Sequence, residues 1–386
     1  MSTNDVFYLE LSQPFNTMSP PWINLSDVSP LPVRLSWATS SYGGANNRMI
    51  FIFGGTMQAV EPAQDLGSNA LLPDFKNLVY SFDTQSFQWS IPIISGDAPN
   101  RRRELSAVTN DRGKIHFFGG KADRFTGSSI EGDFNEMNVL DSLTLNWELG
   151  TLDGAPTPRD GHTATILNNG LIVFIGGREM AGPDNNLSLV NMRSIDVYDT
   201  KSAEWYFIQA AGPLVEGRIL HSAVLMQDNR IIVYGGVNSE NGTSSSPVLV
   251  VLDTRPQPYL WSIPKISATI FPPPLITHTA ALVGDYMLVA FGNITNTITK
   301  ERAINNEMFL LDIRTFTWVN RFEPSTIGNY SIPIGIIIGA SIGGALFLVA
   351  LGFGIKLICK WQRIRRNRVH RSSLPIPVSG NRYHIR

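Results

Sequence analysis

The chain has 386 residues, with 31 lysines and arginines, 32 aspartates and glutamates, and one cysteine. Nine of the basic residues and no acidic one lie in 356–386, so the preceding part holds 22 basic against 32 acidic residues, a formal charge of −10. Such an acidic body argues against a nucleic-acid partner, because phosphate binding requires clustered positive charge. A single cysteine also excludes an internal disulfide bond.

The first predicted element is the apolar strand Asn4–Leu11, which is followed at a distance by Trp22. A strand with a spaced tryptophan returns five times further along the chain, each time after a glycine-terminated strand pair. No such pair precedes the first strand or follows Trp318, and Met1–Ser19 lacks the features of a signal peptide. We therefore expect either that Met1 is an internal methionine of a longer chain, or that the ring of units is incomplete or completed by a partner.

Five short runs rich in β-branched and aromatic residues end in a glycine doublet or its near equivalent. The runs are Met49–Gly55, Lys114–Gly120, Leu171–Gly177, Arg230–Gly236 and Tyr286–Asn293. The glycines are Gly54, Gly55, Gly119, Gly120, Gly176, Gly177, Gly235 and Gly236, with Gly292 before Asn293 in the fifth run. The first glycines lie 57 to 65 residues apart, a period that is typical of a radial β-repeat.

Each unit carries three further marks in a constant order. An Arg-x-x-[His/Ser/Trp] pattern precedes the run, at Arg34 and Trp37, Arg103 and Ser106, Arg159 and His162, and Arg218 and His221. The fifth unit keeps His278 but has Leu275 in place of the arginine. After the run, a hydrophobic strand ends at Asp83, Asp141, Asp199, Asp253 or Asp312. A tryptophan then follows at Trp89, Trp147, Trp205, Trp261 or Trp318.

These marks predict four short strands per unit, the sheet size of a propeller blade. We expect the doublets to adopt φ > 0 or to pack where a Cβ would clash, with Asn293 as the best substitute for glycine. We expect the tryptophans to bury large surfaces between neighbouring blades. The prediction is an all-β domain over residues 1–319, with five full blades and a half blade here and six blades in the intact protein.

The order of these marks resembles the kelch repeat, whose blades combine a glycine doublet, a strand ending in Tyr-Asp or similar, and a spaced tryptophan. Tyr198, Asp199 and Trp205, after Gly176 and Gly177, give the cleanest match. The resemblance covers about residues 1–320 and implies a kelch-type β-propeller, similar to the central domain of galactose oxidase. A WD-type propeller is disfavoured, because its period is shorter and its Gly-His and Trp-Asp marks are absent.

The segment after the repeats is uniformly apolar. Its 22 consecutive uncharged residues, Ile334–Ile355, predict a transmembrane helix over 333–358, with a stalk at 320–332 and a basic tail at 359–386. By the positive-inside rule the tail is cytosolic and the propeller is extracellular or lumenal. The alternative is a tail-anchored protein with a cytosolic propeller. The predicted architecture resembles that of single-pass membrane kelch-repeat proteins of filamentous fungi.

Several residues near this segment are candidates for modification or pairing. Four sequons are glycosylation candidates, at Asn24, Asn186, Asn241 and Asn329, whereas a fifth at Asn293 is expected in a tight turn. Cys359 is a candidate for S-palmitoylation, although it could equally be inert. Helix pairing into a homodimer is predicted through Gly335, Gly339 and Gly343, although glycine is common in membrane helices. The basic tail suits an anionic inner leaflet.

No motif predicts catalysis, a cofactor or a metal site. The copper site of the galactose oxidase family needs a cysteine crosslinked to a tyrosine, and no cysteine precedes Cys359. The remaining histidines of the repeats, His116, His162, His221 and His278, lie one per blade, which favours a scaffold role.

We therefore expect a non-enzymatic protein that binds a protein or a glycan through its propeller loops. The longest of these segments are 55–83, 121–137 and 178–194, which could equally be solvated connectors. The alternative function is that of a carbohydrate-active enzyme or an oxidase-like protein without a recognisable copper site.

Overall fold

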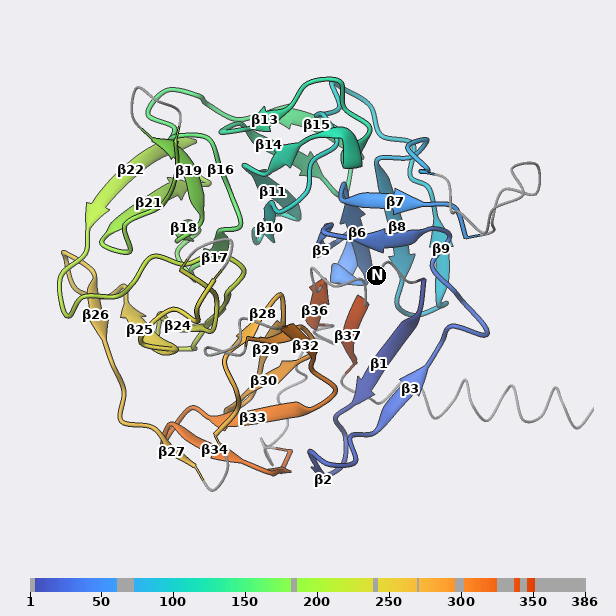
Figure 1. The fold of residues 1–386 in the computed structure, drawn as a ribbon. Coiled ribbons are helices and arrows are strands. Elements are labelled where there is room, and N and C mark those ends of the chain that lie inside the picture. Colours follow the sequence, from blue (N-terminus) through green and yellow to red (C-terminus); the bar gives the residue numbers. More distant parts are fainter. Residues whose placement is uncertain are drawn as a thin grey trace, which may run out of the picture.

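The computed structural model describes residues 4–60, 73–181, 186–238, 242–268, 271–295, 302–324, 337–340 and 346–350. Almost all regular elements in this part of the chain are strands, and they form a ring of sheets around a common axis (Figure 1). The helical elements are the short 3-10 turns Ala45–Asn47 and Arg124–Thr126. No helix within these residues has the length and apolar character needed to cross a bilayer.

Five blades follow one another along the chain, each with four antiparallel strands in chain order from the axis outward. Blade 1 consists of β5 (Thr39–Gly43), β6 (Met49–Phe53), β8 (Val79–Asp83) and β9 (Gln88–Ser90). Blade 2 consists of β10 (Ser106–Thr109), β11 (Lys114–Phe118), β14 (Met137–Asp141) and β15 (Asn146–Leu149). Blade 3 consists of β17 (Thr163–Ile166), β18 (Leu171–Ile175), β21 (Ser194–Asp199) and β22 (Glu204–Gln209).

The last two of these blades follow the same pattern. Blade 4 consists of β23 (Ser222–Leu225), β24 (Arg230–Tyr234), β25 (Leu249–Asp253) and β26 (Leu260–Ser262). Blade 5 consists of β29 (Thr279–Val283), β30 (Tyr286–Ala290), β33 (Met308–Asp312) and β34 (Thr317–Val319), with β27 (Ser267–Ala268) added in parallel to its outer edge. The all-β prediction with four strands per repeat is therefore confirmed for these five units.

The second strand of each blade is the apolar run that ends at the doublet. In β6, β11, β18 and β24 every residue after the first is buried, and in β30 all five are. Such runs do not alternate between polar and apolar residues, because neighbouring blades cover both faces of the strand. Their β-branched and aromatic side chains fit that pleated, fully enclosed position.

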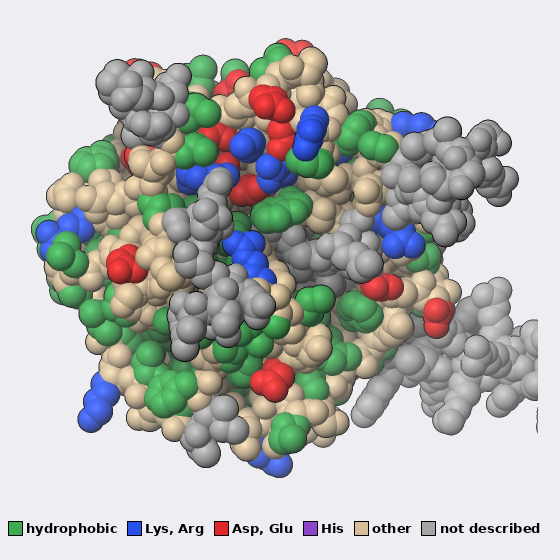
Figure 2. Space-filling model, in the orientation of Figure 1, with side chains coloured by type: hydrophobic (Ala, Val, Ile, Leu, Met, Phe, Trp, Pro, Cys, Tyr) green, Lys and Arg blue, Asp and Glu red, His purple; other side chains and the backbone are tan. Residues whose placement is uncertain are grey.

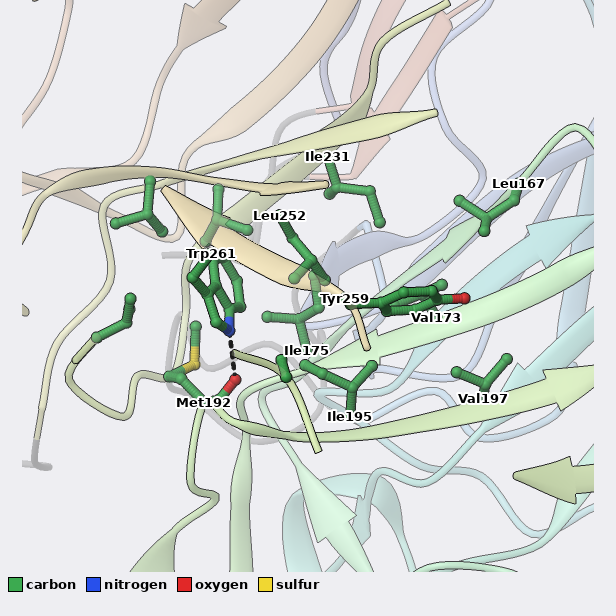
Figure 3. Close-up of a cluster of buried hydrophobic side chains, with 14 residues drawn as sticks. Leu167, Val173, Ile175, Met192, Ile195, Val197, Ile231, Leu252, Tyr259 and Trp261 are labelled. Atoms are coloured by element: carbon green, nitrogen blue, oxygen red, sulfur yellow. Dashed lines mark hydrogen bonds between the residues drawn. The ribbon is translucent and has the colours of Figure 1, made fainter. Parts of the chain in front are cut away.

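The hydrophobic core lies mainly between blades. One cluster joins Val173 and Ile195 of blade 3 to Ile231 and Trp261 of blade 4 (Figure 3). The indole of Trp261 is buried there and donates a hydrogen bond of 2.7 Å to the backbone oxygen of Met192, in the preceding blade. Each blade is thus held by the apolar face of its neighbour, which is why a single blade would not be stable alone.

A sixth sheet combines the two ends of the chain. Its order from the rim inward is β3 (Trp22–Asn24), β1 (Val6–Glu10), β37 (Leu346–Ala350) and β36 (Ile337–Ala340). The pairing of β1 with β3 is antiparallel, whereas the pairing of β1 with β37 is parallel. The innermost strand β36 lies between β29 of blade 5 and β5 of blade 1, which closes the ring (Figure 1). A short pair of β2 (Phe15–Asn16) and β35 (Arg321–Phe322) also joins the two ends.

The sixth sheet bears on two predictions, the uncompleted N-terminal half blade and the transmembrane helix over 333–358. The expectation that no segment after Trp318 completes the N-terminal half blade is wrong in this structure. Strands, not helix, are found at 337–340 and 346–350 of the predicted membrane segment, whose other residues lie outside the described part of the chain. The physical reason is the inner edge of β1, whose backbone groups and buried side chains, such as Val6 and Leu9, need a neighbour. An apolar segment meets both needs.

Candidate functional site

One end of the ring carries a second layer of small sheets, which we call the upper face. The segment after each doublet turns back there and pairs with the segment that leads into the innermost strand of the same blade, in blades 2 and 4 through single bridges. These sheets comprise β4 (Arg34–Ser36) with β7 (Thr56–Gln58), β12 (Lys121–Ala122) with β13 (Gly132–Asp133), β16 (Arg159–Asp160) with β19 (Arg178–Ala181) and β20 (Asn186–Leu189), and β28 (Leu275–Ile276) with β31 (Asn293–Thr295) and β32 (Arg302–Ile304). The long segments 55–83, 121–137 and 178–194 contribute to this layer, and 61–72 and 182–185 lie outside the described residues.

A belt of backbone hydrogen bonds joins blades 1 to 5 around the axis beneath this layer. Its members are the residues two positions before the innermost strands, and from blade 2 to blade 5 the N–H of each donates to the carbonyl of the member in the preceding blade. The belt runs through Trp37, Glu104, Gly161, Leu220 and Thr277, with N···O distances of 3.2, 2.9, 3.2 and 3.0 Å. All five have φ between 54° and 66°. A non-glycine residue rarely adopts this conformation, so the belt holds four of them in a strained geometry.

Charged side chains gather over blades 2 and 3 on the upper face (Figure 2). We call this group the ion network, and its members are Arg103, Glu104, Lys121, Asp123, Asp133, Asp160 and Arg178. Arg103 donates to Asp123 at 2.7 Å and also bonds Glu104. Arg178 holds Asp160 through two hydrogen bonds of 2.8 and 3.0 Å. The network joins the belt residue Glu104 of blade 2 to strands of blade 3.

The ion network has more acidic than basic members, four against three. Burial, and next the nearby charge of Asp160, raise the pKa of Glu104 to about 7. Burial and Asp160 also raise the pKa of Asp133 to about 6. The carboxyl groups of the network thus outnumber the cations near them, and a positive charge brought from outside would favour their ionised forms.

The predicted arginines occupy equivalent positions in their blades once two of the assignments are shifted by one residue. The carbonyls that accept from the second glycine of the preceding blade belong to Arg102, Arg159, Arg218 and Leu275. The equivalent residue in blade 2 is thus Arg102, not Arg103. Each of these residues lies two positions before the belt residue of its blade, so the equivalent residue in blade 1 is Leu35, not Arg34. Arg218 is buried and donates to the carbonyls of Gly235 and Pro247, at 3.0 and 2.8 Å. Burial lowers its pKa to about 10.

The histidines lie at the junctions between blades and not in one site. His162, His221 and His278 each come directly after a belt residue, where they pack against the first doublet glycine of the preceding blade. His221 Nε2 lies 3.1 Å from Thr163 Oγ1, and burial lowers the pKa of His278 to about 3. His116 is buried within β11, where burial lowers its pKa to about 4. The described residues contain no group of His, Cys, Asp and Glu side chains that could hold a metal ion.

The doublets occupy two distinct positions. A Cβ on the first glycine would approach the next blade, 2.6 Å from the Arg218 carbonyl oxygen at Gly176 and 2.3 Å from that of Leu275 at Gly235. A Cβ on the second would meet its own blade. By this criterion Gly292 is a second glycine, and Phe291, with φ 62°, takes the first position. The fifth doublet is therefore Phe291–Gly292, and the assignment of Asn293 as its second member was wrong.

The remaining predicted residues are spread over the molecule. The indoles of Trp89, Trp205 and Trp261 donate to backbone oxygens of the preceding blade, at 3.1, 3.2 and 2.7 Å, and Trp147 and Trp318 are buried in their outer strands. Asn24 is exposed at the end of β3, Asn186 begins β20, and Asn293 bonds Thr277 through its amide. Gly339 lies in β36. Asn241, Asn329, Gly335, Gly343 and Cys359 lie outside the described residues.

Sequence reasoning missed the ion network. Its members come from five separate stretches of the chain, and no spacing rule joins Glu104 to Asp160 or Arg178. One signal was present, because Arg101–Glu104 is the most highly charged run that leads into any innermost strand. Its acidic residue occupies the belt position, where the other blades have Trp37, Gly161, Leu220 and Thr277.

Comparisons with known proteins agree with this architecture. A family model described as the Attractin/LZTR1 beta-propeller matches residues 67–332. Kelch domain-containing protein 3 of Rattus norvegicus is 34% identical over 168 residues, which cover 42% of this chain and 41% of that protein. Host cell factor of Drosophila melanogaster is 24% identical over 265 residues, 63% of this chain and 17% of that protein. The matches thus span about two-fifths or less of the length of these relatives.

Proposed function

This chain belongs to the kelch-repeat β-propeller family, and from this premise we propose that its propeller is a protein-interaction module whose partner binds the upper face of blades 2 and 3. Family membership alone does not assign a function, so the proposal rests on the site. The ring supplies a rigid base, and the second layer supplies side chains that differ from blade to blade. This combination is usual for recognition surfaces.

The observation that carries the proposal is the ion network beside exposed apolar side chains. Phe125, 52% exposed, lies in the short helical turn that follows Asp123, and Ile130 lies before β13. Met180 and Leu187 are both exposed and face each other across the pair β19–β20. Apolar anchors next to polar groups are the usual composition of a protein interface. A basic side chain flanked by apolar ones would suit this surface, because it would balance the excess carboxylate of the network.

Site-specific photo-crosslinking tests this proposal. A photoreactive residue at Phe125 of the full chain should capture a partner in the native membrane fraction. The same residue at Leu143, 57% exposed in the turn between β14 and β15 at the opposite end of the blade, should not. The double variant F125A/M180A should abolish capture by a photoreactive residue at Ile130 and leave folding unchanged. Equal capture at Phe125 and Leu143 would refute the proposal.

We also propose that the module is membrane-anchored, with the propeller extracellular or lumenal and a glycan as the alternative ligand. Support comes from the 22 uncharged residues Ile334–Ile355 and the nine basic residues that follow them. A bilayer helix and the strands β36 and β37 exclude each other for this segment. The proposal therefore requires that, in the membrane-anchored protein, this segment leaves the sixth sheet, where its strand β37 pairs with β1 in parallel, although the same pairing is antiparallel in the five complete blades.

Endoglycosidase treatment of the protein from a eukaryotic membrane fraction tests the topology. A lumenal propeller should lose mass on treatment, and the variant N24Q should lose less, because Asn24 is an exposed sequon. Protease added to intact microsomes should leave the propeller whole. Digestion of the propeller without any mass shift would instead establish the cytosolic arrangement.

A further inference from the structure

The outer edge of a blade is covered by the segment that arrives from the preceding blade. In blade 2 the Ser95 N–H donates to the Leu145 carbonyl and the Trp147 N–H donates to the Ser95 carbonyl, both at 2.9 Å. Ala211 covers β26 of blade 4 with two equivalent bonds, and β27 covers β34 of blade 5. In blade 1 the hydroxyl of Ser29 donates to the carbonyl of the residue just before β9. A covered outer edge is thus the rule in this ring.

Blade 3 departs from this rule within the described part of the chain. The arriving segment reaches β22 through the hydrogen bond that the Trp205 indole donates to the Thr151 carbonyl, at 3.2 Å. It makes none of the backbone bonds to β22 that cover the edges of blades 2, 4 and 5. A Cβ on Gly154 would lie 3.4 Å from the side chain of Trp205, whereas one on Gly212 would lie 2.3 Å from the Trp261 carbonyl oxygen. The segment therefore lies farther from β22 than its counterpart does from β26.

The strand β22 is also poorly protected against pairing with another strand. It has six residues, whereas the outer strands of the other complete blades have three or four. The outward backbone groups belong to Trp205, Phe207 and Gln209, because the equivalent tryptophan N–H is bonded outward in blades 2 and 4. Tyr206 is 44% and Phe207 60% exposed, and Glu204 is the only charged residue of the strand. A long edge of this composition is a template for strand addition.

We propose that two copies of this chain pair along β22, antiparallel and around a two-fold axis at Phe207. In this register the outward N–H and C=O of Phe207 bond those of its own counterpart in the second copy. The outward groups of Trp205 bond those of Gln209 in the same way. The two outer strands then form one continuous sheet across the dimer. The pairing lies at the rim of the ring and leaves the upper face of each copy free (Figure 1).

The side chains that meet in this register favour a second copy as the occupant. Phe207 lies opposite its counterpart, and Tyr206 lies opposite Ile208. Aromatic pairs and pairs of aromatic with β-branched residues stabilise antiparallel sheets. Glu204 lies opposite Ala210, so no like charges are opposed.

The charge of the two bodies predicts how the dimer responds to salt. Each copy has a formal charge of −10 before its basic tail, so association should strengthen as salt screens the repulsion. A basic segment of another protein would instead bind this acidic body more weakly at higher salt.

Disulfide crosslinking of the full chain, with Cys359 replaced by serine, tests the register. F207C should form a covalent dimer on mild oxidation, because hydrogen-bonded residues that lie opposite each other have Cα atoms about 5.5 Å apart, within the reach of a disulfide. E204C is the matched control on the same strand. Its counterpart would lie about 20 Å away, six residues along the strand, so this variant should remain monomeric. Equal crosslinking of the two variants, or none at F207C, would overturn the proposal.

A second variant separates strand pairing from contact between side chains. F207P removes an outward N–H and keeps the pairing with β21, since proline is tolerated on an edge strand where the N–H faces outward. Sedimentation of the full chain in detergent should show a concentration-dependent dimer that higher salt strengthens and F207P weakens about tenfold. L260A, which removes an exposed side chain from the covered strand β26, should leave the dimer unchanged. A dimer that is indifferent to F207P, or one that salt weakens, would overturn the proposal.

Discussion

The junction between blades 4 and 5 and the junction between blade 5 and the sixth sheet use equivalent strands in different ways. In the first, Gly235 lets the Leu275 backbone approach, and Ser222 bonds His278. In the second, Phe291 occupies the glycine position and Thr279 has no partner. The first junction lies within a run of complete repeats, whereas the second receives strands from both ends of the chain.

The two junctions differ in whether the first doublet position needs a glycine. Its first member is required where the neighbouring backbone fills the space of a Cβ, and a phenylalanine is accepted where it does not. The strained φ is common to both junctions, 70° at Gly235 and 62° at Phe291. Contact with the next blade is therefore the stronger constraint at this position, since backbone strain alone does not exclude a side chain.

The largest effect is expected for G176V. A β-branched residue is disfavoured at φ 64°, and its Cβ would lie 2.6 Å from the Arg218 carbonyl oxygen and 2.8 Å from His221 Cε1. We expect a loss of more than about 4 kcal/mol in the free energy of unfolding, enough to unfold most of the protein. Chemical denaturation followed by circular dichroism measures it. G132V is the control, because nothing lies within 4 Å of a Cβ there; equal stability of the two variants would contradict the role of the doublet.

The next effect concerns the inner edge of β1. A chain that ends at Pro324 lacks β36 and β37, so the backbone of Val6–Glu10 loses its inner partner. We expect this chain to self-associate and to melt lower than one that ends at residue 358, because an open apolar strand edge pairs with other chains. Size-exclusion chromatography with light scattering measures the state of both. A monomeric short chain with unchanged Tm would show that the edge needs no partner.

A smaller effect is expected for H278F. The substitution keeps a ring against Tyr234, whose centroid lies 5.3 Å from that of His278, but removes the bond to Ser222. The junction should then resemble that at Thr279 and lose about 1–3 kcal/mol, the cost of a buried hydroxyl left unpaired. H162F is the matched control, since neither ring nitrogen of His162 has a hydrogen-bond partner. Equal losses of stability in urea denaturation would show that the hydrogen bond between His278 and Ser222 contributes nothing.

The pH dependence of stability gives the smallest effect. Burial raises the pKa of Glu104 from 4.5 to about 7, so the folded protein holds its proton more tightly than the unfolded chain. Stability from this group is complete below pH 4.5 and is lost as the pH rises towards 7. E104Q should therefore lose less stability than the parent between pH 5 and 7.5, by on the order of 1 kcal/mol. Urea midpoints at both pH values measure this, and a response of the exposed control E131Q equal to that of E104Q would refute it.

The features that recur in every repeat could be predicted from the sequence. The features that depend on contacts between neighbouring blades could not. The strand runs, doublets and tryptophans recur at one period, so their places in the blades followed directly. The arginine of blade 2 was assigned one residue too late, because Arg101, Arg102 and Arg103 all fit the local pattern and only the next blade's contact selects one. Phe291 was missed because the first position of every doublet was expected to be a glycine. The ion network joins residues as far apart as Glu104 and Arg178, and no local pattern contains that pairing.

Native-state hydrogen exchange is the most direct test of the difference between the sixth sheet and the complete blades. The third strands β1, β8, β14, β21, β25 and β33 hold the same place in their sheets and can be compared amide by amide. We expect β1 to open with a lower free energy than the other five strands, which exchange together through global unfolding. Protection of Val6–Glu10 equal to that of Ser194–Asp199 would contradict it, because the sixth sheet would then be as firmly built as a complete blade.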